Sequence, residues 1–334
     1  MKHPPLRVAV IGCGAICGNH IKAIQDAGQI LCALCDVDES RAERMIEKYG
    51  LENVKIYTDY RVMLELEKPH AVHICTPHDL HVPMTVEALR RNVHVLCEKP
   101  VCISIEELDA LRYAVQNSKA QLGVCHQNRY EPNMIRLKEL SGGQVKAGFG
   151  SVVWHRDETY YHSAEWRGTW AREGGGVMIN QALHTLDLMQ WICGFPKSVI
   201  AHTYNDRLQN VIEVEDTATA CFECENGVRF NFFATNTCAS DLPVHIQIKL
   251  HNGDMIDAQN KQFCFNHEPM ETVHKTETVG KHVWGDGHKA LIADFYECVQ
   301  KKKPFSIGLE EAEKVIRMIL TMYASNGERI EILY

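Results

Sequence analysis

The chain has 334 residues, of which 45% are hydrophobic and 23% are charged, a composition typical of a globular protein and not of a disordered one. The net charge of −8, with no basic run longer than Lys301-Lys302-Lys303, argues against a nucleic-acid partner. No segment reaches the roughly 18 uninterrupted apolar residues that a membrane span needs. A chain of this length predicts two domains.

The N-terminal apolar stretch Val8–Cys17 superficially resembles a signal peptide, but glycines interrupt it and Arg7 stands directly against it. We therefore expect no secretory leader. The fourteen cysteines fall mostly inside apolar runs, where cysteine acts as a small hydrophobe, and this favours a reducing, cytoplasmic compartment.

Two C-x-x-C spacings, Cys32 to Cys35 and Cys221 to Cys224, raise the possibility of zinc or redox chemistry. Both lie in expected strands, where residues three apart point to opposite faces of the sheet. The histidine pairs near residues 70 and 80 have no further ligand at a fixed local spacing. The sequence therefore predicts no metal site.

From residue 6 to residue 126, short apolar segments alternate with amphipathic helical patterns. The expected strands are 6–11, 30–35, 70–75, 93–97 and 121–126, and the expected helices are near 15–27, 39–49, 59–66, 80–91 and 104–117. Asp38, Asp59 and Ser104 are suitable helix N-caps, with Glu107 completing a capping box, and Gly50 follows the second helix. This alternation predicts an α/β domain over residues 1–126 with a parallel sheet.

After residue 126 the pattern changes to longer strands joined by tight turns. The expected strands are near 145–158, 197–206, 214–225, 228–238, 243–251 and 254–258, and the expected helices are near 176–192, 288–301 and 309–325. Asn226-Gly227 and Asn252-Gly253 are strong hairpin signals. Residues 127–334 are therefore expected to form an α+β domain with an open, mostly antiparallel sheet, whose uncovered face would form a homo-oligomer interface.

The first expected strand runs into a glycine turn. In the dinucleotide fingerprint G-x-G-x-x-G, Gly12 makes the tight turn and Gly14 lets the backbone approach the pyrophosphate. Cys17 occupies the third position, where a small residue can still pack closely, and Gly18 follows it. The amides at the helix start, after Ala15, would face the phosphates. The competing interpretation is a glycine turn without a ligand.

An acidic residue strengthens the dinucleotide interpretation. Asp36 closes the second expected strand, 24 residues after Gly12, where a carboxylate accepts hydrogen bonds from the adenosine ribose. Because this carboxylate would repel the 2′-phosphate of NADP, we expect NAD to be the preferred cofactor, although Arg41 could turn toward a phosphate.

Two later strands end in polar residues, in Cys75-Thr76-Pro77-His78 and in Cys97-Glu98-Lys99-Pro100. In open α/β sheets these strand ends line the ligand crevice. A lysine directly after a buried strand, before a proline that restricts its backbone, is placed to project its ammonium into that crevice. The alternative is that Glu98 and Lys99 form a solvated loop pair.

In the second half, three glycines at 174–176 precede a helix that carries Asn180 and His184. Residues four apart share one face of a helix. A lone helical histidine is more often structural, but this pair follows Trp166, Arg167 and Trp170, which favours one wall of a polyol pocket.

Together these residues resemble the Gfo/Idh/MocA family, that of glucose-fructose oxidoreductase and inositol dehydrogenase. The resemblance rests on the Gly12 turn with His20, Cys75-Thr76-Pro77 followed by His81, Glu98-Lys99-Pro100, Arg129 with Pro132, residues 176–187 (GVMINQALHTLD), and Trp284-Gly285-Asp286-Gly287-His288 through Asp294-Phe295. It covers nearly the whole chain. The Glu-Lys-Pro tripeptide and the order of Lys99 before His184 are specific.

The resemblance implies a Rossmann domain followed by an α+β domain that commonly mediates dimers or tetramers. It also implies NAD(P)-dependent oxidation of a secondary hydroxyl of a sugar, inositol or related molecule. Lys99 and His184 match the family's catalytic lysine and histidine, and Asn180 stands where many members have Asp. The implied cofactor-binding residues are Gly12, Gly14, Ala15, Ile16, Asp36, Thr76, Pro77, His81, Glu98 and Lys99. The implied substrate-binding residues are Lys99, Arg129, Trp166, Arg167, Trp170, Asn180 and His184.

The chemistry fits this assignment. Removing a hydride from a carbinol carbon requires its hydroxyl proton to leave, so neutral His184 suits as the base and Lys99 as the group that stabilises the oxyanion. A desolvated Lys99 acting as the base itself is the alternative. Two other functions stay open: a glycoside-cleaving enzyme that oxidises and re-reduces its substrate with tightly held NAD, and a non-catalytic NAD-bound sensor.

Overall fold

The computed structural model describes residues 3–259, 262–271 and 287–333. These fall into two compact units. The first unit holds residues 3–127 together with residues 287–312, and the second holds the described residues of 128–271 together with residues 313–333. None of the helices in the described part of the chain combines the length and the apolar character needed to cross a membrane.

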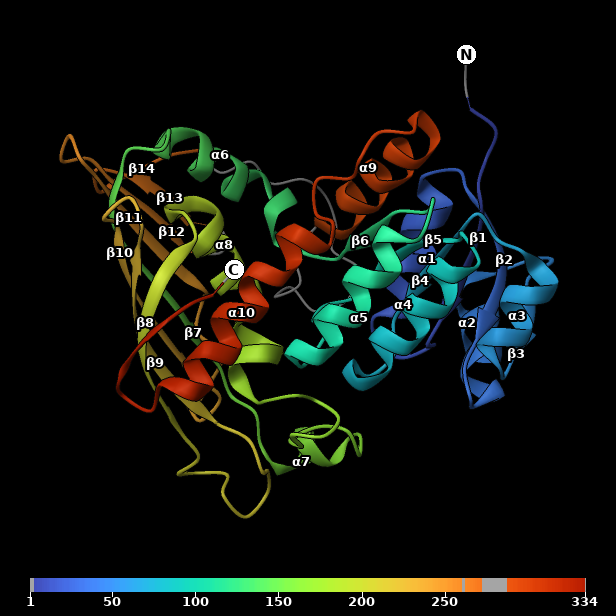
Figure 1. Cartoon of the computed structure of the whole chain (residues 1–334), viewed down its shortest axis with the longest axis horizontal. Coiled ribbons are helices and arrows are strands. Elements are labelled where there is room, and N and C mark those ends of the chain that lie inside the picture. The colour runs from blue at the N-terminus through green and yellow to red at the C-terminus, as the bar shows by residue number, and fades with distance from the viewer. Residues whose placement is uncertain (1–2, 260–261, 272–286, 334) are drawn as a thin grey trace. The chain divides into compact units, whose positions relative to one another are not determined.

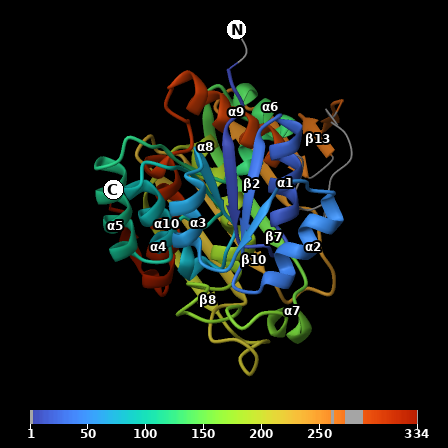
Figure 2. The ribbon, with the colours of Figure 1, turned by 90° about the vertical axis from the view of Figure 1, so that its right-hand side faces the viewer.

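The first unit is built on a six-stranded parallel sheet in the order β3-β2-β1-β4-β5-β6 (Figures 1 and 2). The strands are β1 (Arg7–Ile11), β2 (Ile30–Cys35), β3 (Lys55–Tyr57), β4 (Ala71–Ile74), β5 (His94–Cys97) and β6 (Leu122–Val124). This is the doubly wound dinucleotide-binding order, and the strand order reverses between β1 and β4. The predicted parallel sheet is confirmed, and only the short β3 is absent from the sequence-based expectation.

Helices cover both faces of this sheet. They are α1 (Cys17–Asp26), α2 (Glu39–Tyr49), α3 (Tyr60–Glu67), α4 (His81–Arg90), α5 (Ile105–Gln116) and α9 (Gly287–Lys301). Figure 2 shows α1 and α2 on one side of β1 and β2, and α3 to α5 on the other. Although α9 comes late in the sequence, it packs against α1. Part of the predicted motif before it, residues 284–286, lies outside the described residues.

The predicted helix ends have physical causes in the structure. Asp38 and Asp59 accept hydrogen bonds from backbone N–H groups of the first turns of α2 and α3, and Ser104 does so at α5. The return bond of the expected capping box is displaced by one residue, because Glu107 accepts from the N–H of Ile103. These caps explain why the helix starts could be located from sequence.

The second unit contains a nine-stranded sheet in the order β14-β13-β12-β11-β7-β10-β9-β8-β15. The strands are β7 (Val145–Val153), β8 (Pro196–Tyr204), β9 (Thr217–Cys224), β10 (Arg229–Thr235), β11 (His245–Leu250), β12 (Met255–Gln259), β13 (Gln262–Phe265), β14 (Glu268–Pro269) and β15 (Arg329–Glu331). Both predicted hairpins form, β9 with β10 and β11 with β12. All neighbours are antiparallel except β7 and β10, so the predicted mostly antiparallel sheet is confirmed.

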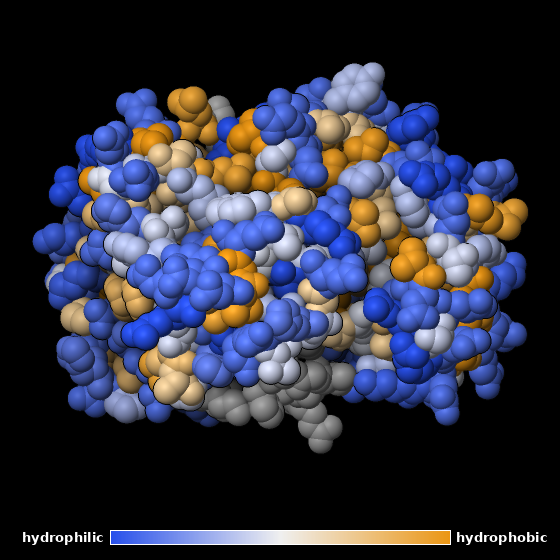
Figure 3. Space-filling view, turned by 90° about the horizontal axis from the view of Figure 1, so that it is seen from below, coloured by the Kyte–Doolittle hydropathy of each residue, from blue (hydrophilic) through white to orange (hydrophobic). Residues whose placement is uncertain are grey.

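Alternating side chains bury one face of this sheet. In β11, for example, Ile246, Ile248 and Leu250 are buried while the residues between them are partly exposed. The other helices are α6 (Pro132–Ser141), α7 (Glu158–His162), α8 (Leu183–Cys193) and α10 (Leu309–Ser325). Helix α8 covers β7, where glycines at 148 and 150 leave room for Met189. On the face of the molecule seen in Figure 3, hydrophobic side chains are scattered among hydrophilic ones.

Candidate dinucleotide and substrate sites

The turn after β1 requires glycine at its first position. Gly12 has a φ of +92°, and a Cβ there would lie 2.6 Å from the backbone carbonyl of Cys75 at the end of β4. The Gly12 N–H donates to the carbonyl of Cys35 at the end of β2, at 2.8 Å. The turn therefore lies between the ends of β2 and β4, the two strands that flank β1. This is the point where ligands bind in open α/β sheets.

The next part of the turn is open. A Cβ at Gly14 would meet no atom within 4 Å, and Gly14, Ala15 and Ile16 are all at least partly exposed. Helix α1 begins at Cys17 with no side-chain cap and no acidic residue in its first turn. An uncapped helix start beside open space suits an anion such as a pyrophosphate.

Close helix packing in this motif comes from Gly18. A Cβ at Gly18 would lie 2.1 Å from the hydroxyl of Tyr49, whereas Cys17 is fully buried as an ordinary small side chain. The packing role expected at the third position of the fingerprint is thus shared with the following residue.

Asp36 connects the turn to the end of β2. Its Oδ2 accepts the N–H of Cys13 at 2.8 Å, and its Oδ1 accepts the N–H of Asp38 at 3.0 Å. The guanidinium of Arg41 lies 3.9 Å from Oδ1. Since each carboxylate oxygen has two acceptor sites, this fixed carboxylate retains capacity for ribose hydroxyls.

His81 joins the loops that follow β4 and β5. Its Nδ1 lies 2.7 Å from the carbonyl of Pro100, and its Nε2 lies 2.9 Å from the carbonyl of Thr76. Burial lowers the pKa of His81, while the two carbonyl contacts act in the opposite direction. The imidazole therefore ties the loop of Thr76-Pro77 to the loop that contains the cis Lys99–Pro100 peptide.

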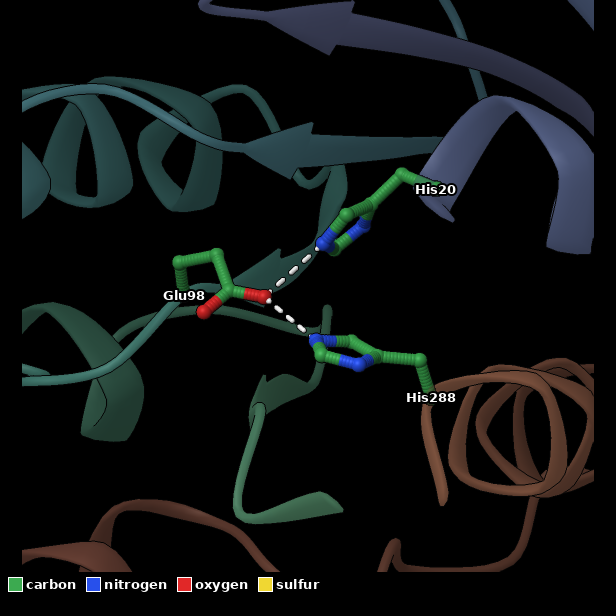
Figure 4. Close-up of side chains that lie close together, drawn as sticks. All are labelled: His20, Glu98 and His288. Carbon is green, nitrogen blue, oxygen red and sulfur yellow. Dashed lines mark hydrogen bonds and ion pairs between the residues drawn. The ribbon is translucent and has the colours of Figure 1, made fainter. Parts of the chain in front are cut away.

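Glu98, the residue before Lys99, is the centre of a buried cluster (Figure 4). Its Oε1 accepts from His20 Nε2 on α1 at 2.9 Å and from His288 Nε2 on α9 at 3.1 Å. Burial alone would raise the pKa of Glu98, but these two N–H donors hold it well below its usual range. Glu98 is thus a buried carboxylate and not a solvated loop residue.

The cluster continues as a directional chain of hydrogen bonds. Because His20 Nε2 donates to Glu98, its Nδ1 accepts from His73 Nδ1 at 2.8 Å, and His73 Nε2 then accepts from the hydroxyl of Tyr296 at 2.8 Å. All of these side chains are buried. One proton arrangement, with both histidines neutral, satisfies every member of the chain.

His20, Glu98 and His288 are also the one group of metal-type ligands that the described residues bring together. Their ligand atoms lie within 4.8 Å of one another, and they come from positions up to 268 residues apart. Local spacing could not reveal such a group. The hydrogen bonds to Glu98 already account for its geometry, and no ion is needed to explain it.

This chain predicts a loss of stability in acid. Burial foremost lowers the pKa of His20, and burial with the neighbouring His20 lowers that of His73 well below 6.5. The unfolded chain then binds more protons than the folded one, so the free energy of unfolding falls as the pH drops below about 6.5, by up to about 1.4 kcal/mol per pH unit for each histidine. In urea titrations from about pH 5 to 7, His73→Asn should show a slope smaller by roughly one proton.

His162→Asn is the matched control, because it makes the same substitution at an exposed histidine on α7, outside the buried chain. His73→Asn should also lower stability at pH 7 by about 2 kcal/mol, since it leaves polar groups of His20 and Tyr296 without their partner. An unchanged acid slope in His73→Asn would contradict the neutral chain.

In the second unit, Asn180 and His184 form a partly exposed stripe on an otherwise buried segment. Every other residue from 173 to 190 is buried. Asn180 lies in a π-helix, Met178–Ala182, which leads into α8, where His184 stands in the first turn. Such π-helical insertions are frequent at functional sites. Asn180 and His184 are thus the two residues of this segment that are partly open to solvent.

The glycines before this segment have a packing role. A Cβ at Gly176 would lie 1.9 Å from the carbonyl oxygen of Glu215, and one at Gly175 would lie 1.9 Å from the hydroxyl of Tyr323. The Glu215 carboxylate accepts the N–H groups of Gly176 and Met178, and burial raises its pKa to about 7. Glu215 therefore caps the segment that carries Asn180, a role that no local sequence signal indicated.

Trp166, Arg167 and Trp170, which were also predicted to bind substrate, make two different sets of contacts. Arg167 packs its guanidinium over the rings of Tyr160 and Trp166, and it contacts the Tyr160 hydroxyl, which lies 3.4 Å from the amide nitrogen of Asn180. Trp170 instead contacts the loop before β9, where its indole N–H donates to the carbonyl of Glu213.

Arg129 is the last of the residues that were predicted to bind substrate. It is buried and makes a bidentate pair with Asp187 on α8, with both contacts at 2.7 Å. This pair holds α8 from its buried side.

Comparisons with known proteins agree with this geometry. Residues 6–126 match the description "Oxidoreductase family, NAD-binding Rossmann fold", and residues 137–255 match "GFO/IDH/MocA C-terminal domain". The chain belongs to the Gfo/Idh/MocA family of oxidoreductases, and its first unit carries that family's NAD-binding Rossmann domain.

Among curated relatives, the D-glucoside 3-dehydrogenase of Escherichia coli is 30% identical over 214 residues, which are 61% of this chain and 59% of that protein. The myo-inositol 2-dehydrogenase of Thermotoga maritima is 28% identical, over 57% of this chain and 55% of that protein. The matches thus span less than two thirds of these relatives.

Among solved structures, the WlbA dehydrogenase of Bordetella pertussis, in complex with NADH and UDP-GlcNAcA, aligns with a TM-score of 0.84 at 25% identity, covering 99% of this chain and 100% of that one. A levoglucosan dehydrogenase in complex with NADH and levoglucosan shares the fold, with a TM-score of 0.86 at 17% identity, over 99% of this chain and 100% of that one.

Proposed function

We propose that the protein is an NAD-dependent dehydrogenase that oxidises a secondary hydroxyl of a sugar, inositol or glycoside. The observation that carries the proposal is the partly exposed stripe of Asn180 and His184 on a segment that is otherwise buried. Membership of an NAD-binding oxidoreductase family supports it, as do relatives named as glucoside and inositol dehydrogenases.

The residues of the first unit fit a dinucleotide. The open space at Gly14 and the uncapped start of α1 would receive the pyrophosphate, and the fixed Asp36 carboxylate would accept the ribose hydroxyls. When bound, the nicotinamide supplies the hydride acceptor. The chain's own contribution is to hold the cofactor and to move the hydroxyl proton.

Two side chains perform that proton chemistry in the proposal. His184, as a neutral imidazole, takes the proton of the hydroxyl, and the Lys99 ammonium stabilises the oxygen on which negative charge develops. The buried Glu98 cluster and His81 fix the backbone around Lys99, because the Lys99 N–H lies 3.3 Å from Glu98 Oε2. Asn180 positions the substrate, since an amide can bind a hydroxyl but cannot accept its proton at neutral pH.

Asp36 predicts a preference for NAD over NADP. A 2′-phosphate about 4 Å from this carboxylate would cost on the order of 4 kcal/mol at an effective dielectric constant of 20, less with relaxation. Arg41 already lies between Asp36 and Asp38, within 3.9 Å of both, and this weakens its pull on a phosphate. Calorimetric titration should therefore give a Kd for NADP at least tenfold above that for NAD. Equal or tighter NADP binding would contradict the role given to Asp36.

The function itself is tested by measuring NADH absorbance with a panel of hexoses, inositols, glycosides and nucleotide sugars. The proposal expects steady NADH formation with at least one of them. Cleavage of a glycoside without net NADH would instead identify an enzyme that oxidises its substrate only transiently. NAD binding without any turnover would favour a sensor.

The proposal extends to assembly and location. The partly exposed side of the second unit's sheet, which includes His245, Gln247 and Asp257, would pair with a second copy in a homodimer or homotetramer. All fourteen cysteines are free thiols, and most are buried, which supports a reducing, cytoplasmic compartment.

A further inference from the structure

Glu173 is a buried carboxylate that no sequence motif singled out. It is 1% exposed and lies in the turn before the glycines at 174–176. Its Oε2 accepts the backbone N–H of Gly168 at 2.5 Å, and its Oε1 contacts the side-chain amide nitrogen of Asn180. The carboxylate therefore bridges the loop that carries Arg167 and the π-helix that carries Asn180.

The chemistry of these contacts fixes which way the Asn180 amide points. Both carboxylate oxygens of Glu173 accept hydrogen bonds here, whereas an asparagine side chain has a donating end and an accepting end. Only the donating NH₂ end can face Glu173, and the same nitrogen lies 3.4 Å from the Tyr160 hydroxyl. The carbonyl oxygen of Asn180 must then point away from Glu173.

We propose that Glu173 is a positioning residue, which orients Asn180 so that the substrate meets an accepting oxygen beside His184. This inference rests on the proposed function, in which Asn180 binds substrate. It narrows the substrate class to polyols that donate a hydroxyl at this point, next to the carbon that is oxidised. An analogue with hydrogen or a methoxy group in place of that hydroxyl should bind at least about tenfold more weakly.

The first test is Glu173→Gln, which keeps the shape of the side chain. Since the Gly168 N–H still needs an acceptor, the Gln oxygen stays on that side and its NH₂ turns toward Asn180. Asn180 must then flip and offer its NH₂ to the substrate. KM should rise about tenfold or more while kcat falls less than about threefold and Tm changes little.

The second test exchanges the acid and the amide. Asn180→Asp alone places two carboxylates together, so one of them must bind a proton. Because this proton is held only in the folded state, the variant should lose stability as pH rises from 6 to 8, by more than wild type does. In the double variant Glu173→Gln, Asn180→Asp, the introduced amide donates its NH₂ to the introduced carboxylate, and an accepting oxygen again faces the substrate. Both KM and the Tm profile should return toward wild type.

The outcomes separate the possible failures. If Glu173→Gln leaves KM unchanged, or if the double variant is no better than Asn180→Asp, then Glu173 does not orient Asn180 and the inference is overturned. The Tm series needs no substrate. A wild-type protein without turnover on any substrate overturns the proposed function, and with it the substrate role of Asn180, even where the Tm series shows the pairing with Glu173.

Discussion

Lys99→Met and His184→Ala should each lower kcat by roughly 100-fold or more, and His184→Ala should leave the affinity for NAD almost unchanged. Both groups act mainly in the transition state, one on the developing oxyanion and one on the departing proton. The cofactor is held elsewhere, by the Gly12 turn and Asp36. Steady-state kinetics with the preferred substrate and calorimetric titration with NAD measure the two quantities.

Asn180→Ala provides the contrast, because it should raise KM more than it lowers kcat. The pH profile separates His184 from the alternative base. With His184 as the base, kcat/KM should show an acid limb that reports protonation of its imidazole, and this limb should disappear in His184→Ala. If this limb persists in His184→Ala and kcat falls less than about tenfold, Lys99 is the base and the role given to His184 is wrong.

Substitution by alanine should have different effects at two glycines of the same turn. At Gly12 it should lower stability, and at Gly14 it should weaken NAD binding. Gly12→Ala should lower the free energy of unfolding by about 3 kcal/mol, because it combines a positive φ with a Cβ 2.6 Å from the backbone of Cys75. Gly14→Ala should change the stability of the cofactor-free protein by less than about 1 kcal/mol, since its Cβ meets nothing within 4 Å. It should nevertheless raise the Kd for NAD at least about tenfold, because its methyl group occupies the space of the pyrophosphate.

Urea unfolding without cofactor and calorimetric titration with NAD measure the two effects. Gly28→Ala is a useful control, since Gly28 also has a positive φ but an open Cβ position, and it isolates the cost of backbone conformation. Equal loss of stability in Gly12→Ala and Gly28→Ala would show that the contact with Cys75 does not constrain the turn. Normal NAD affinity in Gly14→Ala would contradict the cofactor position.

The fold could be predicted in large part because its signals are local. Helix caps such as Asp38 and Asp59, the two Asn-Gly turns and the hydrophobic periodicity all act within a few residues. Short elements such as β3 and β14 lack that periodicity, since three or two residues cannot show a repeat. The contact of α9 with α1 joins residues more than 250 positions apart, and no local pattern encodes it.

The candidate site likewise has residues that local spacing predicts and supporting residues that it does not. The Gly12 turn, Asp36 and the stripe of Asn180 and His184 follow from spacing on a strand or helix. Their supporting carboxylates lie in a turn, for Glu173, and in the loop before β9, for Glu215, and the sequence shows both only as ordinary acidic residues. Glu98 was visible as a motif, but its partner His288 lies 190 residues away, so its charge state could be argued only from the structure.

The fate of a deuterium label tests the central claim most directly. The protein is incubated with NAD and a turned-over sugar that carries deuterium on the oxidised carbon, and mass spectrometry locates the label. For a dehydrogenase that uses Lys99 and His184, each oxidised sugar molecule should yield one released NADH carrying deuterium, and His184→Ala should slow this transfer by roughly 100-fold. Label recovered in a cleaved sugar product, with NAD regenerated and no NADH released, would contradict the account.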